Sequence, residues 1–171
     1  MHTSEEYVQL RTERLRKDGT GPGKHWHVAV DETNGNIAGF AAWNAPGDWQ
    51  GHKDVHVDAV DPDVNPALCD EQLNTVVRQG LTEMRRNIMG DRSDYWYLAT
   101  LGVHPDYQGR GVAKMLLQHG LRMADEEHKD VYLASSPAAF PLYQKLDFRE
   151  LGRLPLLGGR YVLTGMLRYA R

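Results

Sequence analysis

Two glycines stand two residues apart in the segment Gln-Gly-Arg-Gly-Val-Ala at positions 108–113, where an aliphatic run gives way to a helical pattern. The start of a helix offers backbone N–H groups that have no partner within the helix, together with the positive end of the helix dipole. Glycine lets an anion approach that backbone because no Cβ lies in the way. The spacing predicts a turn that holds a diphosphate, with a glycine-rich turn into a packed helix as an equal alternative.

The segment differs from two common phosphate-binding motifs. No Gly-Lys-Ser/Thr occurs in the chain, which excludes the P-loop. The Rossmann fingerprint needs a third glycine or alanine in a different phase and an early strand-helix-strand unit. If the turn binds a diphosphate, it therefore belongs to another class of site.

Histidine and aspartate alternate elsewhere in the chain, so that their side chains would share one face of a strand. The residues of this kind are His52, Asp54, His56 and Asp58, and His25 with His27 repeats the spacing. Such a face could bind a metal ion, but a polar face in solvent is the preferred interpretation. We expect no metal site and assign no general base. Cys69 is expected to be a buried helix residue and not a nucleophile.

Hydrophobic periodicity places these residues on alternating helices and strands. Strands are expected at residues 26–30, 37–43, 95–103, 131–134 and 161–167, with a hairpin at the Asn-Gly between the first two. Helices are expected at 3–17, from Asn65-Pro66 to 88, at 109–127 and near 142–145, and Gly80 marks either a break or a close contact. Residues 44–65 and 154–159 are expected to be loops, the first with a short strand at 55–60. This order predicts one sheet with helices on both sides.

The composition is that of an ordinary globular domain, since 41% of the 171 residues are hydrophobic and 25% are charged. The net charge of −3 supplies no basic field, so nucleic acid is not an expected partner. A single cysteine forms no internal disulfide, which fits a reducing compartment. No apolar run approaches the length of a membrane span, and the first residues lack the apolar core of a signal peptide. We expect a cytoplasmic protein, with the nucleus as a further location, and no membrane partner.

Residues 101–113, Leu-Gly-Val-His-Pro-Asp-Tyr-Gln-Gly-Arg-Gly-Val-Ala, resemble motif A of the GNAT superfamily of acyl-CoA-dependent N-acetyltransferases. Residues 140–148, Phe-Pro-Leu-Tyr-Gln-Lys-Leu-Asp-Phe, resemble the family's motif B, which commonly has Leu-Tyr-Glu-Lys-Leu-Gly-Phe. The two motifs have the separation typical of the family, and the resemblance covers about residues 26–168. It implies a mixed α/β (α+β) fold of the acyl-CoA N-acyltransferase type, with a mostly antiparallel central sheet and helices on both faces. The whole chain, 1–171, is expected to form one such domain.

Carried over residue by residue, the resemblance implies a site for acetyl-CoA as cosubstrate. The backbone of Leu101, Gly102 and Val103 would pair with the pantetheine arm, and Gly102 suits a bulge that parts this strand from the next. The backbone N–H groups that would hold the diphosphate belong to Gln108, Gly109, Arg110, Gly111, Val112 and Ala113. Lys114 would add positive charge at the rim of the diphosphate site. Equally, it would be an ordinary solvent-exposed residue of the helix. Tyr143 resembles the general acid that protonates the departing thiolate, and no metal is required.

Three features depart from the family pattern. Asp147 stands where motif B usually has glycine. Residues 97–100 lack the glutamate or histidine that serves some members as general base. No β-type run precedes Trp26, so the family's first strand and helix are missing or atypical. A bare sheet edge would invite pairing with another chain, which makes a homodimer one expected arrangement.

The resemblance implies transfer of an acetyl group to a primary amine by direct attack on the thioester. A small-molecule amine is the favoured acceptor, and protein or peptide amines are the alternative. A non-catalytic CoA-binding or interaction module is a different class that the missing base favours and Tyr143 opposes. A plain nucleotide-binding module is a third class, which predicts that ATP or NAD competes equally with CoA.

Overall fold

The structure is a computed structural model that describes residues 23–47 and 71–171. Several expectations fall on other residues: the helix at 3–17, most of the loop at 44–65 with its strand at 55–60, and the helix start at Asn65-Pro66. Cys69, His52, Asp54, His56 and Asp58 also lie outside the described residues.

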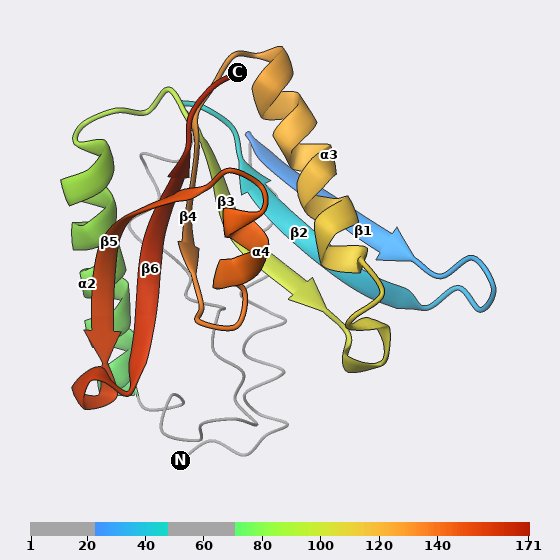
Figure 1. The fold of residues 1–171 in the computed structure, drawn as a ribbon, viewed down its shortest axis with the longest axis horizontal. Helices are drawn as coiled ribbons and strands as arrows, with labels where there is room; N and C mark the ends of the chain where they lie inside the picture. Colours follow the sequence, from blue (N-terminus) through green and yellow to red (C-terminus); the bar gives the residue numbers. More distant parts are fainter. Residues whose placement is uncertain (1–22, 48–70) are drawn as a thin grey trace.

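Six strands form one sheet, in the spatial order β1-β2-β3-β4-β6-β5 (Figure 1). Their bounds are Lys24–Val30 for β1, Ile37–Asn44 for β2, Trp96–Val103 for β3, Val131–Ser135 for β4, Arg149–Leu156 for β5 and Tyr161–Arg168 for β6. Among these strands, β3 and β4 run parallel and every other neighbouring pair is antiparallel. The expected mostly antiparallel sheet is confirmed.

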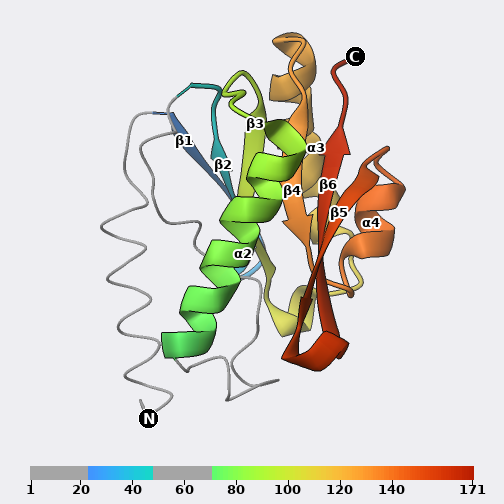
Figure 2. The same cartoon turned by 90° about the vertical axis from the view of Figure 1, so that its left-hand side faces the viewer.

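Helices cover both faces of this sheet. α3 (Val112–Glu126) and the short α4 (Phe140–Gln144) lie on one face, while α2 (Glu71–Met89) lies on the other, as Figure 2 shows from the side. Two 3-10 turns complete the described chain, η3 (Pro105–Tyr107) before α3 and η4 (Leu157–Gly159) between β5 and β6. The expected mixed α/β class with helices on both faces is confirmed.

The sheet divides its core between these two faces by simple alternation. Along β4, Val131 and Leu133 are buried in the cluster that includes α3, and Tyr132 between them is buried in the cluster that includes α2. Successive side chains of a strand point to opposite faces, so a short apolar strand supplies both cores at once. The largest buried side chains of the α3 cluster are Trp43 and Trp96.

The expectation of a loop at 154–159 is wrong for its first half. Leu154, Pro155 and Leu156 belong to β5, which pairs with β6 and places Pro155 opposite Val162. Proline cannot donate to a ladder, which argues against a central strand, but β5 has a neighbour on one side only among the described strands. The turn begins later, at η4.

Two glycines set how closely the helices approach the sheet. Gly80 marks a close contact and not a break, because α2 is continuous and a Cβ at Gly80 would lie 2.7 Å from Cδ1 of Leu154. In α3, a Cβ at Gly120 would lie only 2.2 Å from Cε2 of the fully buried Trp43. Each helix is thus nearer to the sheet than an alanine at that position would permit without rearrangement.

Candidate functional site

The turn between β3 and α3 has the backbone that its two glycines permit. Gly109 and Gly111 have φ angles of +73° and +83°, in the left-handed region that other residues rarely adopt. Gly111 is the N-cap of α3, and no side chain caps this helix end. A Cβ at either glycine would meet no atom of the described chain within 4 Å. The start of α3 therefore offers backbone N–H groups beside open space, as an anion site requires.

The side chains of this turn add positive charge around the same helix end. Arg110 and Lys114 are exposed, and the nearest acidic residue in the sequence, Asp106, is exposed on the preceding η3. The side-chain amide of Gln108 donates to the carbonyl oxygen of Val103 at 3.3 Å, which ties the turn to the end of β3. The residues predicted for diphosphate binding are thus gathered in one short segment, and the geometry fits an anionic group.

The two parallel strands beside this turn part before they end. β3 pairs with β4 only through Trp96–Val131, Tyr97–Tyr132 and Leu98–Leu133. β3 continues to Val103 along β2, and no described strand pairs with its last residues on the β4 side. Leu101, Gly102 and Val103 therefore lie where β3 and β4 diverge, as the ribbon in Figure 1 shows. On that side no described strand pairs with their backbone groups.

The irregularity that accompanies the parting is not at Gly102, where the sequence suggested a bulge. In the β2–β3 register Ala42 is opposite Thr100 and Trp43 is opposite Leu98, so Ala99 is the extra residue. Gly102 instead permits a close approach, because a Cβ there would lie 2.9 Å from the Phe40 ring and this ring would have to shift.

Gly39 on β2 makes a related close approach that the sequence analysis did not identify. A Cβ at Gly39 would lie 2.7 Å from the carbonyl oxygen of Gly102 and 3.1 Å from Val112 at the start of α3. The two glycines together let β2, β3 and the start of α3 approach one another. Nothing in a single sequence distinguishes such a glycine from an ordinary one in a strand.

Tyr143 lies on α4, on the same face of the sheet as α3. Its side chain is 5% exposed and belongs to the α3 core cluster, where its ring meets that of Phe148 edge-on at 5.6 Å. Burial raises the pKa of the Tyr143 phenol well above its ordinary value. The raised pKa keeps the phenol protonated at neutral pH and disfavours a base, while it makes the hydroxyl a weaker proton donor than an ordinary tyrosine.

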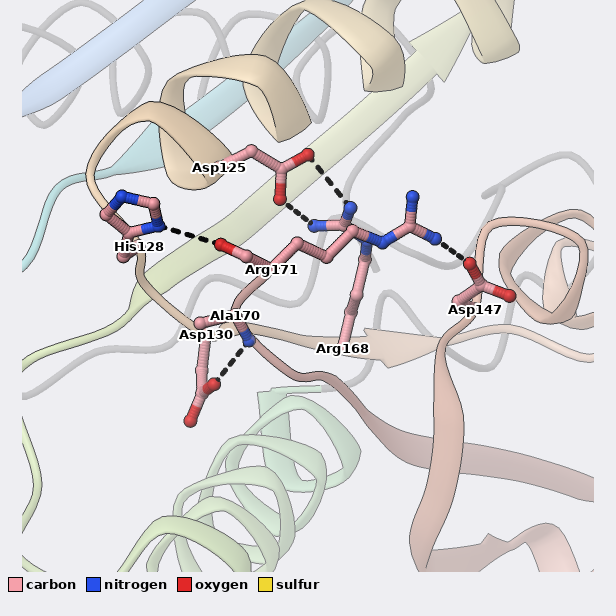
Figure 3. A network of polar contacts seen from close by, with 7 residues as sticks. All are labelled: Asp125, His128, Asp130, Asp147, Arg168, Ala170 and Arg171. Atoms are coloured by element: carbon pink, nitrogen blue, oxygen red, sulfur yellow. Dashed lines mark hydrogen bonds and ion pairs between the residues drawn. The ribbon is translucent and has the colours of Figure 1, made fainter.

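Asp147 adopts the turn conformation after α4 at the position where motif B commonly has glycine. Its φ angle is +65°, a conformation that aspartate tolerates better than most residues, and its carboxylate accepts a hydrogen bond from Arg171 (Figure 3). Beside this pair, the guanidinium of Arg168 binds Asp125 of α3 through two hydrogen bonds of 2.7 and 2.9 Å. The end of β6 is thereby fixed to the end of α3 that lies away from the glycine turn.

Tyr107 on η3 is a residue of the site region that sequence reasoning missed. Its hydroxyl donates to Oδ2 of Asp31 at 2.9 Å and accepts from Nδ2 of Asn34 at 3.2 Å, both in the β1–β2 turn. Its ring lies under the guanidinium of Arg110, whose Cζ is 5.4 Å from the ring centroid. The hairpin turn was predicted, but its contact with a tyrosine far along the chain has no local sequence signal.

The two described histidine candidates lie away from the parted strands. His25 and His27 are on β1, which is separated from β3 by β2, and both face α3. The His25 ring is 5.1 Å from that of Trp96, and the His27 ring is 4.2 Å from that of His119. Burial lowers the pKa of His27, and the neighbouring His119 and His25 lower it further. These residues pack against the helix and its surroundings, so the interpretation as a fully solvated face is wrong for His27.

Within residues 23–47 and 71–171, no helix is long and apolar enough to cross a membrane. No group of three or more His, Cys, Asp or Glu side chains in the same part of the chain is placed to hold a metal ion.

The fold is shared with solved structures that carry acetyltransferase names. An acetyltransferase from Corynebacterium glutamicum, described as histone acetyltransferase HPA2 and related acetyltransferase, aligns with a TM-score of 0.61 and 22% identity over 100% of this chain and 79% of its own. The ribosomal-protein-S18-alanine N-acetyltransferase from Escherichia coli has a TM-score of 0.55 and 19% identity, over 92% and 76% of the two chains. The spermidine/spermine N-acetyltransferase of Vibrio cholerae has a TM-score of 0.52 and 17% identity, over 98% and 79%.

At these identities the structural neighbours establish the fold alone. The family follows from the sequence, because the profile of the acetyltransferase (GNAT) family matches residues 2–148. That range contains both the glycine turn before α3 and Tyr143 on α4. The chain therefore belongs to the acetyltransferase (GNAT) family.

Proposed function

We propose that the protein transfers an acetyl group from acetyl-CoA to the primary amine of a small molecule. The observation that carries this proposal is the divergence of β3 from β4 after Leu98, beside the uncapped start of α3. An extended thioester with a diphosphate at one end has one charged and one chain-like part, and the two features match these parts in order. Tyr143 lies on the α3 side of the same sheet, where a proton donor is needed.

The proposed reaction is a direct transfer in which a C–N bond forms and the C–S bond breaks. A neutral amine attacks the thioester carbonyl, and the backbone of residues 101–103 polarises the carbonyl oxygen. The hydroxyl of Tyr143 gives its proton to the departing sulfur, the amine loses a proton to water, and the tyrosinate takes a proton back from water. Holding both reactants in one site supplies much of the rate enhancement through orientation.

A small-molecule acceptor is preferred because the net charge of −3 gives no reason to choose a strongly charged protein substrate, and the structural neighbours do not decide between the two classes. Those neighbours include an enzyme named for a ribosomal-protein alanine and one named for the polyamines spermidine and spermine, so the shared fold accommodates both classes. A protein or peptide amine is the second candidate. We place the reaction in the cytoplasm, in one domain formed by residues 1–171, with a homodimer as a possible assembly through a bare sheet edge.

The first experiment is thermal unfolding in the presence of acetyl-CoA, CoA, ATP and NAD in parallel. A ligand that binds only the folded protein adds about 2.7 kcal/mol of stability at one hundred times its dissociation constant. We expect acetyl-CoA and CoA to raise the melting temperature and ATP and NAD to leave it unchanged. Equal shifts with all four would favour a plain nucleotide-binding module, and no shift with acetyl-CoA at millimolar concentration would remove the cosubstrate from the proposal.

The second experiment separates an enzyme from a binding module. Thiol release from acetyl-CoA is followed with a panel of amines that contains polyamines, amino acids, aminoglycosides and peptides with free N-termini. We expect turnover with at least one small amine. Turnover with peptides alone would select the second candidate, and CoA binding without turnover on any amine would favour the non-catalytic module.

A further inference from the structure

We infer that Tyr107 and Asp31 are positioning residues, which hold the Arg110 guanidinium at the rim of the diphosphate turn. The inference rests on the proposed function and adds residues that the family motifs do not assign. It assigns a task to the β1–β2 turn, which is distant in sequence from the cosubstrate site.

The contacts form a short chain from the hairpin to the glycine turn. Asp31 accepts hydrogen bonds from the backbone N–H of Thr33 at 2.9 Å and from its hydroxyl at 2.7 Å, so one carboxylate oxygen organises the turn. The other oxygen accepts from the Tyr107 hydroxyl at 2.9 Å. The Tyr107 ring then presents its face to Arg110, which stands between the two glycines of positive φ.

Each link has a physical consequence for an exposed arginine. A free arginine side chain samples many rotamers, and part of this entropy is lost whenever it binds an anion. A cation–π contact with a fixed ring confines the guanidinium before the anion arrives, so less entropy is lost on binding. Tyr107 can act in this way only if its own ring is held, and its hydroxyl contacts with Asp31 and Asn34 provide that support.

The charges around Asp31, Tyr107 and Arg110 are compatible with this positioning role. The Asp31 carboxylate faces Thr33, Asn34 and the Tyr107 hydroxyl, and these hydrogen bonds hold the pKa of Asp31 below its ordinary value. The carboxylate is therefore engaged by the hairpin and the tyrosine. Among the ion pairs between described residues, none joins Arg110 to a carboxylate.

The molecule contains a matched pair for comparison. Arg149 lies over the ring of Tyr169 with its Cζ 5.6 Å from the centroid, nearly the same distance as the 5.4 Å of Arg110 over Tyr107. Tyr169 follows β6, at the end of the molecule away from the glycine turn. Tyr169→Ala therefore removes a similar contact and Tyr169→Phe keeps the ring, both without touching the proposed site.

The experiment is a double-mutant cycle on the full chain. Tyr107→Phe, Tyr107→Ala and Arg110→Ala are made singly, and each tyrosine change is combined with Arg110→Ala. The KM for acetyl-CoA and kcat are measured with a saturating amine, and CoA binding is measured by calorimetry. Acetyl transfer from S-acetylpantetheine, which lacks the diphosphate, is measured in parallel.

We expect Tyr107→Ala to raise the KM for acetyl-CoA and the Kd for CoA by about two- to fivefold, the range of an exposed cation–π contact. kcat should stay within error of the wild type. In the Arg110→Ala background the same change should have no further effect, because the tyrosine acts through the arginine. Tyr107→Phe, which keeps the ring and loses its anchor, should show a smaller effect of the same kind, and rates with S-acetylpantetheine should not change.

Two outcomes would overturn the inference while leaving the proposed function intact. Equal effects of the Tyr107 changes with and without Arg110, or equal losses with S-acetylpantetheine, would mean that Tyr107 merely supports the fold. Wild-type affinity in Tyr107→Phe and Tyr107→Ala would mean that it has no role. A wild-type protein that neither binds CoA nor uses acetyl-CoA would instead reject the proposed function, and the inference with it.

Discussion

On each face of the sheet a glycine lets a helix pack closely against a strand, but the two positions differ in how well they would tolerate a larger side chain. On one face, Gly120 of α3 lies against the indole of Trp43, a rigid ring that is fully buried. On the other, Gly80 of α2 lies against the end of Leu154, a flexible side chain that is only partly buried. The α3 face carries the glycine turn and Tyr143, so the more rigid contact supports the candidate site.

Each face also buries a tyrosine, and the two tyrosines are buried to a similar degree although only one of them is proposed to act in catalysis. Tyr143 on the α3 face and Tyr132 on the α2 face both have a phenol pKa that burial raises above the ordinary value. The Tyr132 hydroxyl is buried with no hydrogen-bond partner in the described chain. Only Tyr143 lies on the face that holds the start of α3 and the motif B helix.

The largest expected effect distinguishes these two tyrosines by activity. Tyr143→Phe should lower kcat for acetyl transfer by about a hundredfold, the lower range for loss of a general acid. Tyr132→Phe, its matched control, should leave kcat unchanged. Steady-state kinetics with acetyl-CoA and the best amine of the panel measures both. Full turnover by Tyr143→Phe would show that another group, or water, protonates the sulfur.

The next effect compares the two helix contacts by stability. Gly120→Ala should lower the free energy of unfolding by about 2–3 kcal/mol, because Trp43 cannot move away in a packed core. Gly80→Ala should change it by less than about 1 kcal/mol, since Leu154 can rotate and alanine favours the helix. Urea denaturation of both variants gives the numbers. A smaller loss for Gly120→Ala than for Gly80→Ala would reverse the comparison.

A third prediction concerns the unpartnered hydroxyl on the α2 face. Tyr132→Phe removes a buried polar atom that makes no hydrogen bond, so the free energy of unfolding should stay the same or rise by about 1 kcal/mol. Thermal and urea unfolding measure this change. A clear loss of stability would show that the hydroxyl is satisfied in solution, for example by a bound water molecule.

The smallest effect is the pH dependence of the contact between β1 and α3. The pKa of His27 is lowered in the folded protein from 6.5, so the unfolded chain takes up this proton more readily. The stability that the neutral His27 contributes is complete above pH 6.5, and it is lost as the pH falls toward the pKa of His27 in the folded protein. His27→Gln should therefore lose less stability than the wild type between pH 7.5 and 5, as measured by urea unfolding at each pH. Parallel curves for the two proteins would show that His27 does not contribute.

The sequence predicted most of the strands and helices because their apolar periodicity is local. It failed at β5, where Gly152 and Pro155 are typical of a loop and become acceptable only because the strand lies at the sheet edge. The contiguous motifs put the glycine turn before α3 and Tyr143 on α4, and the roles of these residues stay predictions. The resemblance could not locate the extra residue at Ala99.

The Trp43–Gly120 and Asp31–Tyr107 contacts could not be predicted from the sequence, for a different reason. Each joins residues more than seventy positions apart, and tertiary packing alone brings them together. A single sequence records the residue types at both ends but not that they meet.

The short pairing between β3 and β4 also has a consequence for the order in which the protein opens. It joins two antiparallel groups of three strands, β1-β2-β3 and β4-β6-β5, through three residue pairs. Regions linked by few backbone hydrogen bonds separate at lower free energy than the ladders on either side, so the two groups should behave as two foldons. Amide hydrogen exchange should show residues 96–98 exchanging before the centres of both groups. A cosubstrate arm that bound both strands would slow this exchange and join the two foldons into one.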